Sequence, residues 1–213
     1  MTDTIDPERT NWNVEYDSVE PIRIRDPVAE ALTVLDPGEP IAIDYADVLK
    51  QAGHSCPTAS GAFRMTQLGL AELYPTELPV RSEIAVTMGG DKSDPTYGVS
   101  SRIISYITGA AEEDGFGGLA GGYGGRNDLL EFGDFGADEP AVAFERTDTG
   151  EAVTVTYHVG DVPGAGPATQ HLQKLIEGTA TAEERSAFAE AWHGRVRTIL
   201  ADEEFFTVSR RDV

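Results

Sequence analysis

The stretch GHSCPTASGAFRMTQLGLAELYP, residues 53 to 75, predicts a long helix that begins at one proline and ends before another. Pro57 fits the first turn of a helix, where its missing N–H breaks no hydrogen bond. The apolar residues that follow fall on one side, and Tyr74-Pro75 ends the helix because the residue before a proline disfavours helical geometry. We expect a helix from Pro57 through Leu73, with small residues in its first turns that let another backbone or a ligand approach closely.

The residues upstream predict two shorter helices and an extended arm. Asp26-Pro27 combines an N-cap with a proline at the first helical position, and Pro37-Gly38 stops the helix that follows. A second helix, Tyr45 to Gln51, leads directly into Gly53. Residues 1 to 20 are polar and aromatic without a period, so they predict an extended N-terminal arm lying on the domain.

The residues downstream predict a sheet and complete an α+β fold. Alternation or β-branched content indicates strands at Glu83 to Met88, Leu129 to Phe132, Ala141 to Arg146 and Ala152 to Val159. The first two strands are separated by two segments: a helix from about Gly98 to Thr108 and a glycine-rich loop over residues 115 to 125. We expect an α+β core over residues 21 to 160, with a mixed or antiparallel sheet and packed helices.

Residues 168 to 213 predict a C-terminal helical extension. Helices are expected at Ala168 to Glu177 and at Ala182 to about Leu200, and Thr181 with Glu184 forms a capping box for the second. This last helix has an apolar face wider than a peripheral element normally exposes, which predicts a homodimer; docking of the face onto the chain's own core is the alternative. The face contains Phe188, Trp192, Val196, Ile199 and Leu200.

The charge balance points to a cytoplasm of high salt concentration. The chain has 16 basic and 37 acidic residues, a net charge of −21, and the acidic excess runs along its whole length. Such self-repulsion is tolerable where salt screens it, so we expect a halophilic protein. Clustered Lys and Arg are missing, and no apolar run approaches the ~20 residues that span a bilayer, so neither nucleic acid nor a membrane is an expected partner.

His54 and Cys56 are the residues best suited to chemistry. They precede the long helix, where an extended chain lets both side chains converge, and Pro57 favours that arrangement. A thiol at the start of a helix lies at the positive end of the helix dipole, which favours the thiolate that binds metals. Cys56 is the only cysteine, so a metal site needs other donors, and His158 after the last strand is a candidate third ligand.

Over roughly residues 45 to 157 the chain resembles the FmdE-like family, which is named after a component of formylmethanofuran dehydrogenase. The resemblance rests on motifs in the family's order, of which the first two contain the loop and the start of the long helix. It implies an α+β core with a metal site, commonly zinc, in a cleft that includes His54 and Cys56. The motifs are Gly53 to Pro57, Gly61 to Met65, Ile107 to Gly109, Gly125 to Leu129 and the hairpin from Phe144 to Val155.

The chain departs from that family at three places. Ala110 stands where typical members have a cysteine, Arg102 stands where they have an acidic residue, and residues 168 to 213 lack the cysteine-rich zinc finger of many members. The resemblance therefore indicates a divergent branch with a reduced set of ligands.

Three functions are consistent with this sequence. The first is a zinc-binding protein in which His54 and Cys56 leave a coordination position open to a small ligand, with the reaction unspecified. The second is a binder of haem or another small-molecule cofactor that uses the same loop. The third is a non-enzymatic interaction module in which Cys56 is merely buried.

The acidic surface predicts that the fold is stabilised by salt. The screening length falls from about 10 Å at 0.1 M salt to about 3 Å at 1 M, so molar potassium chloride weakens the repulsion between carboxylates. The thermal unfolding midpoint, followed by circular dichroism, should rise steadily between these concentrations. An unchanged midpoint would contradict the prediction.

Overall fold

The computed structural model describes residues 10–16, 19–164 and 166–211, and it confirms the α+β class. The helices are α1 (Pro27–Ala31), α2 (Tyr45–Ala52), α3 (Pro57–Leu73), α4 (Pro95–Thr108), α5 (Leu172–Ile176) and α6 (Ala182–Ala201). The strands are β1 (Ile22–Ile24), β2 (Ile41–Ile43), β3 (Ile84–Met88), β4 (Leu130–Phe132), β5 (Ala141–Arg146), β6 (Ala152–Tyr157) and β7 (Phe206–Arg211). Short 3₁₀ helices occupy Ala120–Gly122, Gly166–His171 and Glu203–Phe205.

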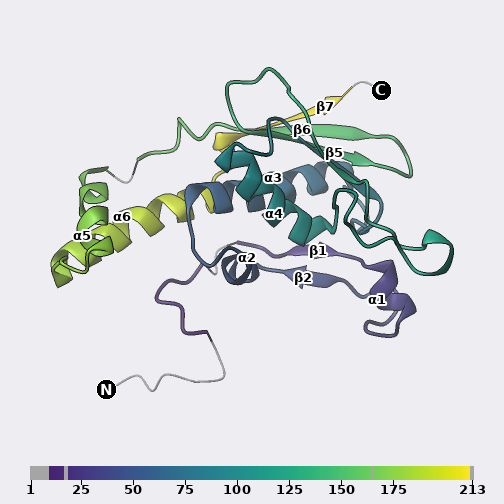
Figure 1. Cartoon of the computed structure of the whole chain (residues 1–213), viewed down its shortest axis with the longest axis horizontal. Coiled ribbons are helices and arrows are strands. Elements are labelled where there is room, and N and C mark those ends of the chain that lie inside the picture. The colour runs from purple at the N-terminus through teal and green to yellow at the C-terminus, as the bar shows by residue number, and fades with distance from the viewer. Residues whose placement is uncertain (1–9, 17–18, 165, 212–213) are drawn as a thin grey trace.

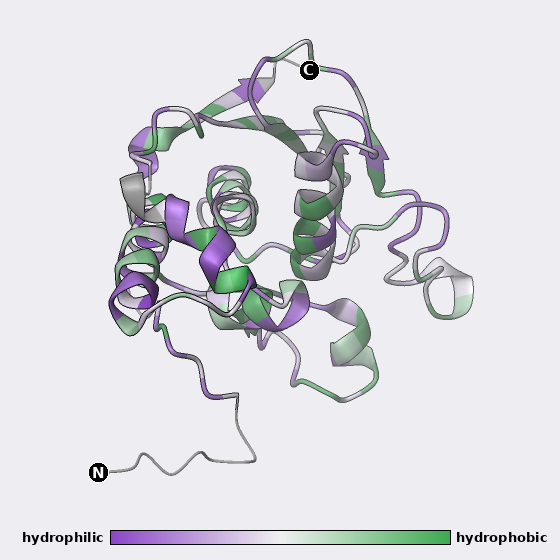
Figure 2. Cartoon of the chain, turned by 60° about the vertical axis from the view of Figure 1, so that its left-hand side comes forward, coloured by the Kyte–Doolittle hydropathy of each residue, from purple (hydrophilic) through white to green (hydrophobic). Residues whose placement is uncertain are grey.

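The large sheet is mixed, and the helices cover one of its faces. Its strand order is β4-β3-β5-β6-β7, with β3 and β4 parallel and the other neighbours antiparallel. Helix α3 contacts β5, β6 and β7, while α4 packs beside α3. Figure 1 shows α3 and α4 between this sheet and the small antiparallel sheet of β1 and β2. The view in Figure 2, turned by 60°, also shows the helices on one side of the large sheet.

Two glycines let α3 lie directly on aromatic rings of the sheet. A Cβ atom at Gly61 would lie 2.4 Å from the ring of Tyr157, and a Cβ atom at Gly69 would lie 2.5 Å from the ring of Phe144. Both distances are far below van der Waals contact, so any side chain at either position would push the helix from the sheet. The close approach expected from the small residues of this helix is therefore made by rings of the protein itself.

A buried ion cluster joins α1 to the end of α4 and to the glycine-rich loop. Asp26 caps α1 through the backbone N–H groups of Val28 and Ala29 and pairs with Arg126 at 2.6 Å and with Arg81 at 3.4 Å. Arg81 also donates to the carbonyl of Ile107 in the last turn of α4. Burial raises the pKa of Asp26, but the charges of Arg126 and Arg81 and the backbone hydrogen bond outweigh it, so the pKa lies below its usual value.

The C-terminal extension is not helical throughout. After α6 the chain returns to the sheet as β7, which pairs with the whole length of β6, from Ala152 opposite Arg211 to Tyr157 opposite Phe206. This strand was not predicted because its alternating stretch is short and its partner lies some fifty residues earlier in the chain. The extension therefore completes the core domain.

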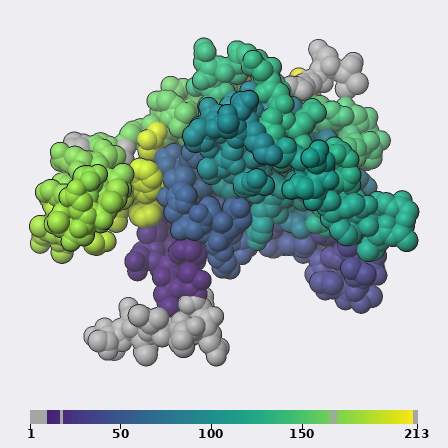
Figure 3. Space-filling model, in the orientation of Figure 1, coloured from purple at the N-terminus to yellow at the C-terminus, as the bar shows by residue number. Residues whose placement is uncertain are grey.

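The apolar face of α6 that suggested a homodimer packs on the chain's own core. Val196, Ile199 and Leu200 are buried, and Trp192 donates a hydrogen bond to the carbonyl of Ser55. Figure 3 shows only the other end of α6, together with α5, projecting from the body. The alternative of docking in cis is confirmed, and this face gives no support for a dimer.

Several other boundaries differ from the predictions. Strands β1 and β2 were not expected, because each has only three residues and pairs only with the other. Helix α4 begins at Pro95 and α1 ends at Ala31, while a 3₁₀ helix occupies most of the first half of the expected helix Ala168 to Glu177. Of the expected arm, residues 1–9 and 17–18 lie outside the described residues; residues 10–16 contain neither helix nor strand, as predicted.

Replacing Asp26→Asn should destabilise the fold by about 3 kcal/mol, because Arg81 and Arg126 would keep their buried charges without a counter-ion. The pKa of Asp26 is depressed in the folded state, so its contribution is complete above the unfolded value near pH 4 and is lost as pH falls through the folded value. Urea unfolding between pH 3 and pH 7 should therefore show a weaker pH dependence in the variant.

The matched control is Glu72→Gln, which removes a solvent-exposed partner of Arg210. Exposed ion pairs contribute about 1 kcal/mol or less, so this variant should unfold nearly as the wild type does. Equal losses in the two variants would contradict the role assigned to the buried cluster.

Candidate functional site

The loop of residues 53–57 links α2 to α3 and is fixed at both ends. Gly53 ends α2 with a left-handed φ of 76°, a conformation that glycine adopts without strain. Cys56 is the N-cap of α3, with an extended backbone and a sulfur that accepts from the N–H of Ala59 at 3.4 Å. The prediction that His54 and Cys56 precede the helix is confirmed.

Ser55, at the centre of the loop, is held by three aromatic residues from separate parts of the chain. Tyr16 of the N-terminal arm donates to its hydroxyl at 2.9 Å, and the hydroxyl of Tyr45 in α2 lies 3.0 Å from the same atom. The indole of Trp192 in α6 donates to its backbone carbonyl at 2.9 Å. The loop is therefore the meeting point of the arm, α2 and α6.

His54 projects into solvent with a defined tautomer. Its Nδ1 lies 3.0 Å from the carbonyl oxygen of Ala52, and because a carbonyl only accepts, Nδ1 carries the hydrogen. In this tautomer Nε2 carries the lone pair that binds metals or accepts a hydrogen bond from a ligand. A backbone carbonyl that orients an imidazole in this way is common around metal-binding histidines.

The structure does not place His158 with the other two predicted ligands. Its two ring nitrogens lie against the carboxylate of Glu139 and the hydroxyl of Thr207, the latter at 2.7 Å, beside the edge strand β7. Among the residues that the structure describes, no three His, Cys, Asp or Glu side chains form a metal-binding group. Ala110 is buried in the apolar core. His54 and Cys56 share the loop before α3, where Nδ1 of His54 lies against the carbonyl of Ala52 and the sulfur of Cys56 accepts from the N–H of Ala59.

A cleft of about 300 Å³ opens beside this loop, and its walls are mainly aromatic. The rings of Phe188 and Trp192 stack with centroids 5.5 Å apart along one wall, and Trp12 of the arm also lines the cleft. Both tryptophans of the chain therefore line this cleft. Its polar groups come from Asn13, Tyr16, His54, Ser55 and His193.

His193 faces the loop through Tyr16. Since the Tyr16 hydroxyl donates its hydrogen to Ser55, its oxygen accepts from Nδ1 of His193 at 2.6 Å. Burial, with a smaller contribution from the charge of Arg197, lowers the pKa of His193 below its ordinary value. The ring is therefore neutral at pH 7, with a lone pair on Nε2.

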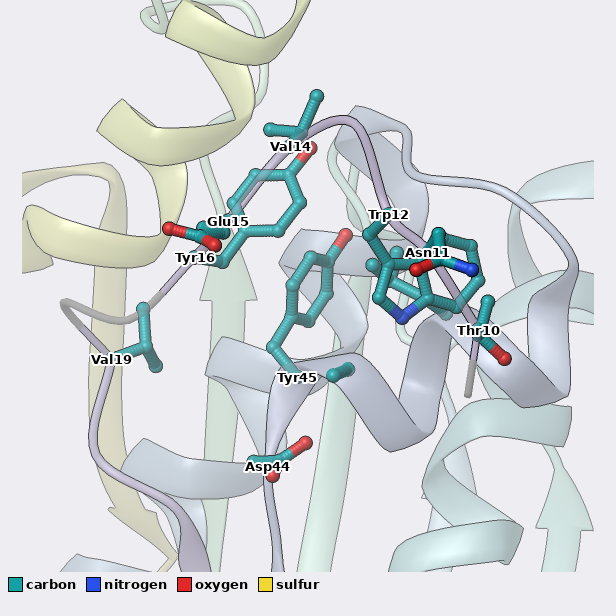
Figure 4. A pocket seen from close by; sticks show the side chains of 11 residues that line it. Thr10, Asn11, Trp12, Val14, Glu15, Tyr16, Val19, Asp44 and Tyr45 are labelled. Atoms are coloured by element: carbon teal, nitrogen blue, oxygen red, sulfur yellow. The ribbon is translucent and has the colours of Figure 1, made fainter. Parts of the chain in front are cut away.

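The arm also covers a second cavity of about 550 Å³ on the side of α2. Figure 4 shows Tyr16 beside Tyr45 with their hydroxyls at the same end, and Trp12 farther along the arm. The rings of Tyr16 and Tyr45 meet edge to face with centroids 5.1 Å apart. Trp12 and Tyr16 thus line both cavities and separate them.

The loop was predictable from the sequence, but most of the cleft was not. The sequence indicated no functional role for His193 or for the arm. The available signal was that Trp12 and Tyr16 stand in an otherwise polar segment, where solvent-exposed aromatic rings are unfavourable. Their partners could not be inferred, because Trp192 and His193 lie about 180 residues away.

Comparison of the sequence with models of known protein families finds no match, and comparison with curated proteins finds none either. The resemblance to the FmdE-like family therefore stays a prediction that rests on its motifs. No helix in the described part of the chain is both long enough and apolar enough to cross a membrane.

Replacing Tyr16→Phe should loosen the arm without unfolding the domain, because it removes the hydroxyl that joins Ser55 to His193 and keeps the ring. The loss should be about 1 kcal/mol, the usual contribution of such hydrogen bonds. Amide hydrogen exchange in residues 10–16 should accelerate severalfold while exchange in β5 and β6 stays slow. The control is Tyr106→Phe, at an exposed tyrosine of α4, and accelerated exchange of the arm in that variant would contradict the assignment.

Proposed function

We propose that the protein binds a small planar molecule in the cleft beside residues 53–57. The observation that supports this most directly is that a concave, mainly aromatic cleft contains a few convergent polar groups, which is the usual composition of a small-molecule site. The stacked rings of Phe188 and Trp192 provide a flat wall, and the exposed His54 stands at the same cleft.

The polar groups define the chemistry of the ligand. Because Nδ1 faces an acceptor in each ring, Nε2 of His54 and Nε2 of His193 are the atoms that can accept a hydrogen bond from the ligand, so an N–H or O–H donor on a flat ring would pair with them. Neither Lys nor Arg is among the described residues that line the cleft, so phosphorylated compounds have no cationic partner from them. The expected ligand is a neutral or cationic heteroaromatic compound.

Tryptophan fluorescence provides a direct test, because both tryptophans lie in the cleft. Benzimidazole, a planar bicycle with a ring N–H, is a suitable probe and should quench the emission in a saturable manner. Phe188→Ala removes one aromatic wall of the cleft and should weaken this binding about tenfold. That factor corresponds to a loss of about 1.4 kcal/mol of binding free energy. Phe116→Ala, at an exposed phenylalanine in the glycine-rich region, is the control and should bind as the wild type does. Quenching that never saturates, or equal weakening in both variants, would contradict the proposal.

Zinc binding by His54 and Cys56 is the second candidate function. It is favoured by the tautomer of His54, which presents a free Nε2 on the same loop as a thiol at a helix start. Two protein donors leave the remaining positions of a tetrahedral zinc ion to water or to a small ligand. When bound, the metal would act as a Lewis acid toward that ligand.

Elemental analysis of protein purified without chelators in molar salt tests whether the protein binds zinc. Stoichiometric zinc should be lost in Cys56→Ala and greatly reduced in His54→Ala, while the unfolding midpoint stays close to that of the wild type, because a chain of 213 residues has a sufficient core without metal. Zinc retained in Cys56→Ala would refute this ligand set. Haem would show strong visible absorbance in the same preparation, whereas zinc is colourless.

A further inference from the structure

Three side chains form a hydrogen-bonded row across neighbouring strands of the large sheet. The carboxylate of Glu139 lies against Nδ1 of His158, and Nε2 of the same ring lies 2.7 Å from the hydroxyl oxygen of Thr207. An ionised carboxylate only accepts, so Nδ1 carries the ring hydrogen and Nε2 presents its lone pair to the hydroxyl. The row therefore has the order and the tautomer of an acid–histidine–hydroxyl triad, in which the histidine takes a proton from a nucleophile.

Backbone hydrogen bonds hold the members of this row in register. Glu139 directly precedes Pro140, whose carbonyl accepts from the N–H of Tyr157 at 2.8 Å, and the N–H of His158 donates to the carbonyl of Phe205 at 2.8 Å. Because β5, β6 and β7 are neighbours in this order, the acid, the base and the hydroxyl come from three adjacent strands or their ends. The sheet itself therefore positions the row.

The row lies on the face of the large sheet that α3 does not cover. The ring of Tyr157 packs against Gly61 of α3, so the next residue, His158, faces the opposite side of the sheet. Thr207 is paired with Thr156, which shares that opposite side. The side chain of His158 is 26% exposed, and Thr207 is exposed. A small molecule in solvent can therefore reach the hydroxyl.

The edge of β7 supplies a hydrogen-bond donor for charge that develops on a substrate. Along an antiparallel pair, successive residues point their N–H groups alternately toward the partner strand and away from it. The bond from His158 to Phe205 sets this alternation, so Thr207 points its N–H toward β6. Val208 then points its N–H away from β6, at the edge of the last strand of the sheet. In hydrolases with a nucleophilic serine, the N–H of the residue after the nucleophile serves as an oxyanion donor.

We propose that Thr207 is the nucleophile of an acyl-transfer site that hydrolyses small activated esters, with His158 as general base and Glu139 as the residue that positions the imidazole. The Thr207 oxygen attacks the carbonyl carbon and its proton moves to Nε2 of His158; the bond to the leaving alcohol then breaks, and the alcohol takes that proton. Water attacks the acyl–Thr207 ester with the same base, which releases the acid and restores the hydroxyl.

This inference is independent of the function proposed above, because none of the three residues lines the aromatic cleft. The row stands on an exposed face, so contacts with the reacting atoms hold most of the substrate. A small acyl group with a good leaving alcohol is therefore the expected substrate.

The test uses p-nitrophenyl acetate and the full-length protein in molar potassium chloride. Mass spectrometry of peptides should find an acetyl group on Thr207, and nitrophenolate release should continue as that group is hydrolysed. His158→Ala should slow the acetylation of Thr207 about 100-fold, a usual contribution of a general base. Thr207→Val, which keeps the shape of the side chain and removes the hydroxyl, should abolish acetylation at this position, and Thr207→Ser should retain it.

Glu139→Gln tests the positioning role, because the amide oxygen can still accept from Nδ1 of His158 but carries no charge. The carboxylate stabilises the imidazolium that forms during the attack, so kcat should fall about tenfold or more. KM for the ester and the thermal unfolding midpoint should stay close to those of the wild type. A contact that only held the strands together would leave kcat unchanged.

Thr87→Val is the matched control. Thr87 belongs to β3 of the same sheet, and its hydroxyl donates to the carboxylate of Glu131 at 3.0 Å rather than to a histidine. Its replacement should leave the acetylation of Thr207 unchanged. The proposal is overturned if Thr207 of the wild type is not acetylated, or if His158→Ala acetylates at the same rate as the wild type; the row would then only hold β7 against its neighbours.

Discussion

The contact of α3 with the large sheet is the constraint on which the rest of the structure depends. Gly61 and Gly69 lie eight residues apart on that helix, and each accommodates an aromatic ring, from Tyr157 of β6 and from Phe144 of β5. Because α3 is held at two points, the helix can neither tilt nor rotate about its axis without a clash. The position of its first turn is thereby fixed, and with it the loop of residues 53–57.

The loop in turn organises the parts of the chain that the core alone would not hold. Ser55 receives hydrogen bonds through both its hydroxyl and its carbonyl, and these come from the arm and from α6. Directional hydrogen bonds between half-buried groups therefore define the geometry of the aromatic cleft. A site built in this way can adapt to a ligand more easily than one formed by the core, because its walls come from elements with few other contacts.

Three arginines of this acidic chain form ion pairs that are largely shielded from solvent on the arginine side. Arg81 and Arg126 neutralise Asp26, and Arg146 pairs with Glu77 and Asp148 while stacking on Tyr74. Arginine suits these positions because its planar guanidinium forms several hydrogen bonds and stacks on rings, whereas the charge of a lysine is concentrated on one compact ammonium group. The remaining basic residues are far outnumbered by the 37 acidic ones, so the chain as a whole carries an excess of carboxylates.

The sequence by itself determined the α+β class, the long helix from Pro57 to Leu73, the hairpin of β5 and β6, and the position of His54 and Cys56 before that helix. These features depend on local signals: a proline at a helix start, alternation along a strand and a turn sequence. Only the tertiary structure decided that His158 lies against Glu139 and Thr207, that β7 closes the sheet, and that Trp12, Tyr16, Trp192 and His193 meet at the loop. These contacts form between residues that are many positions apart in the chain, through packing and a few hydrogen bonds. A pattern within a short window of sequence therefore does not predict them.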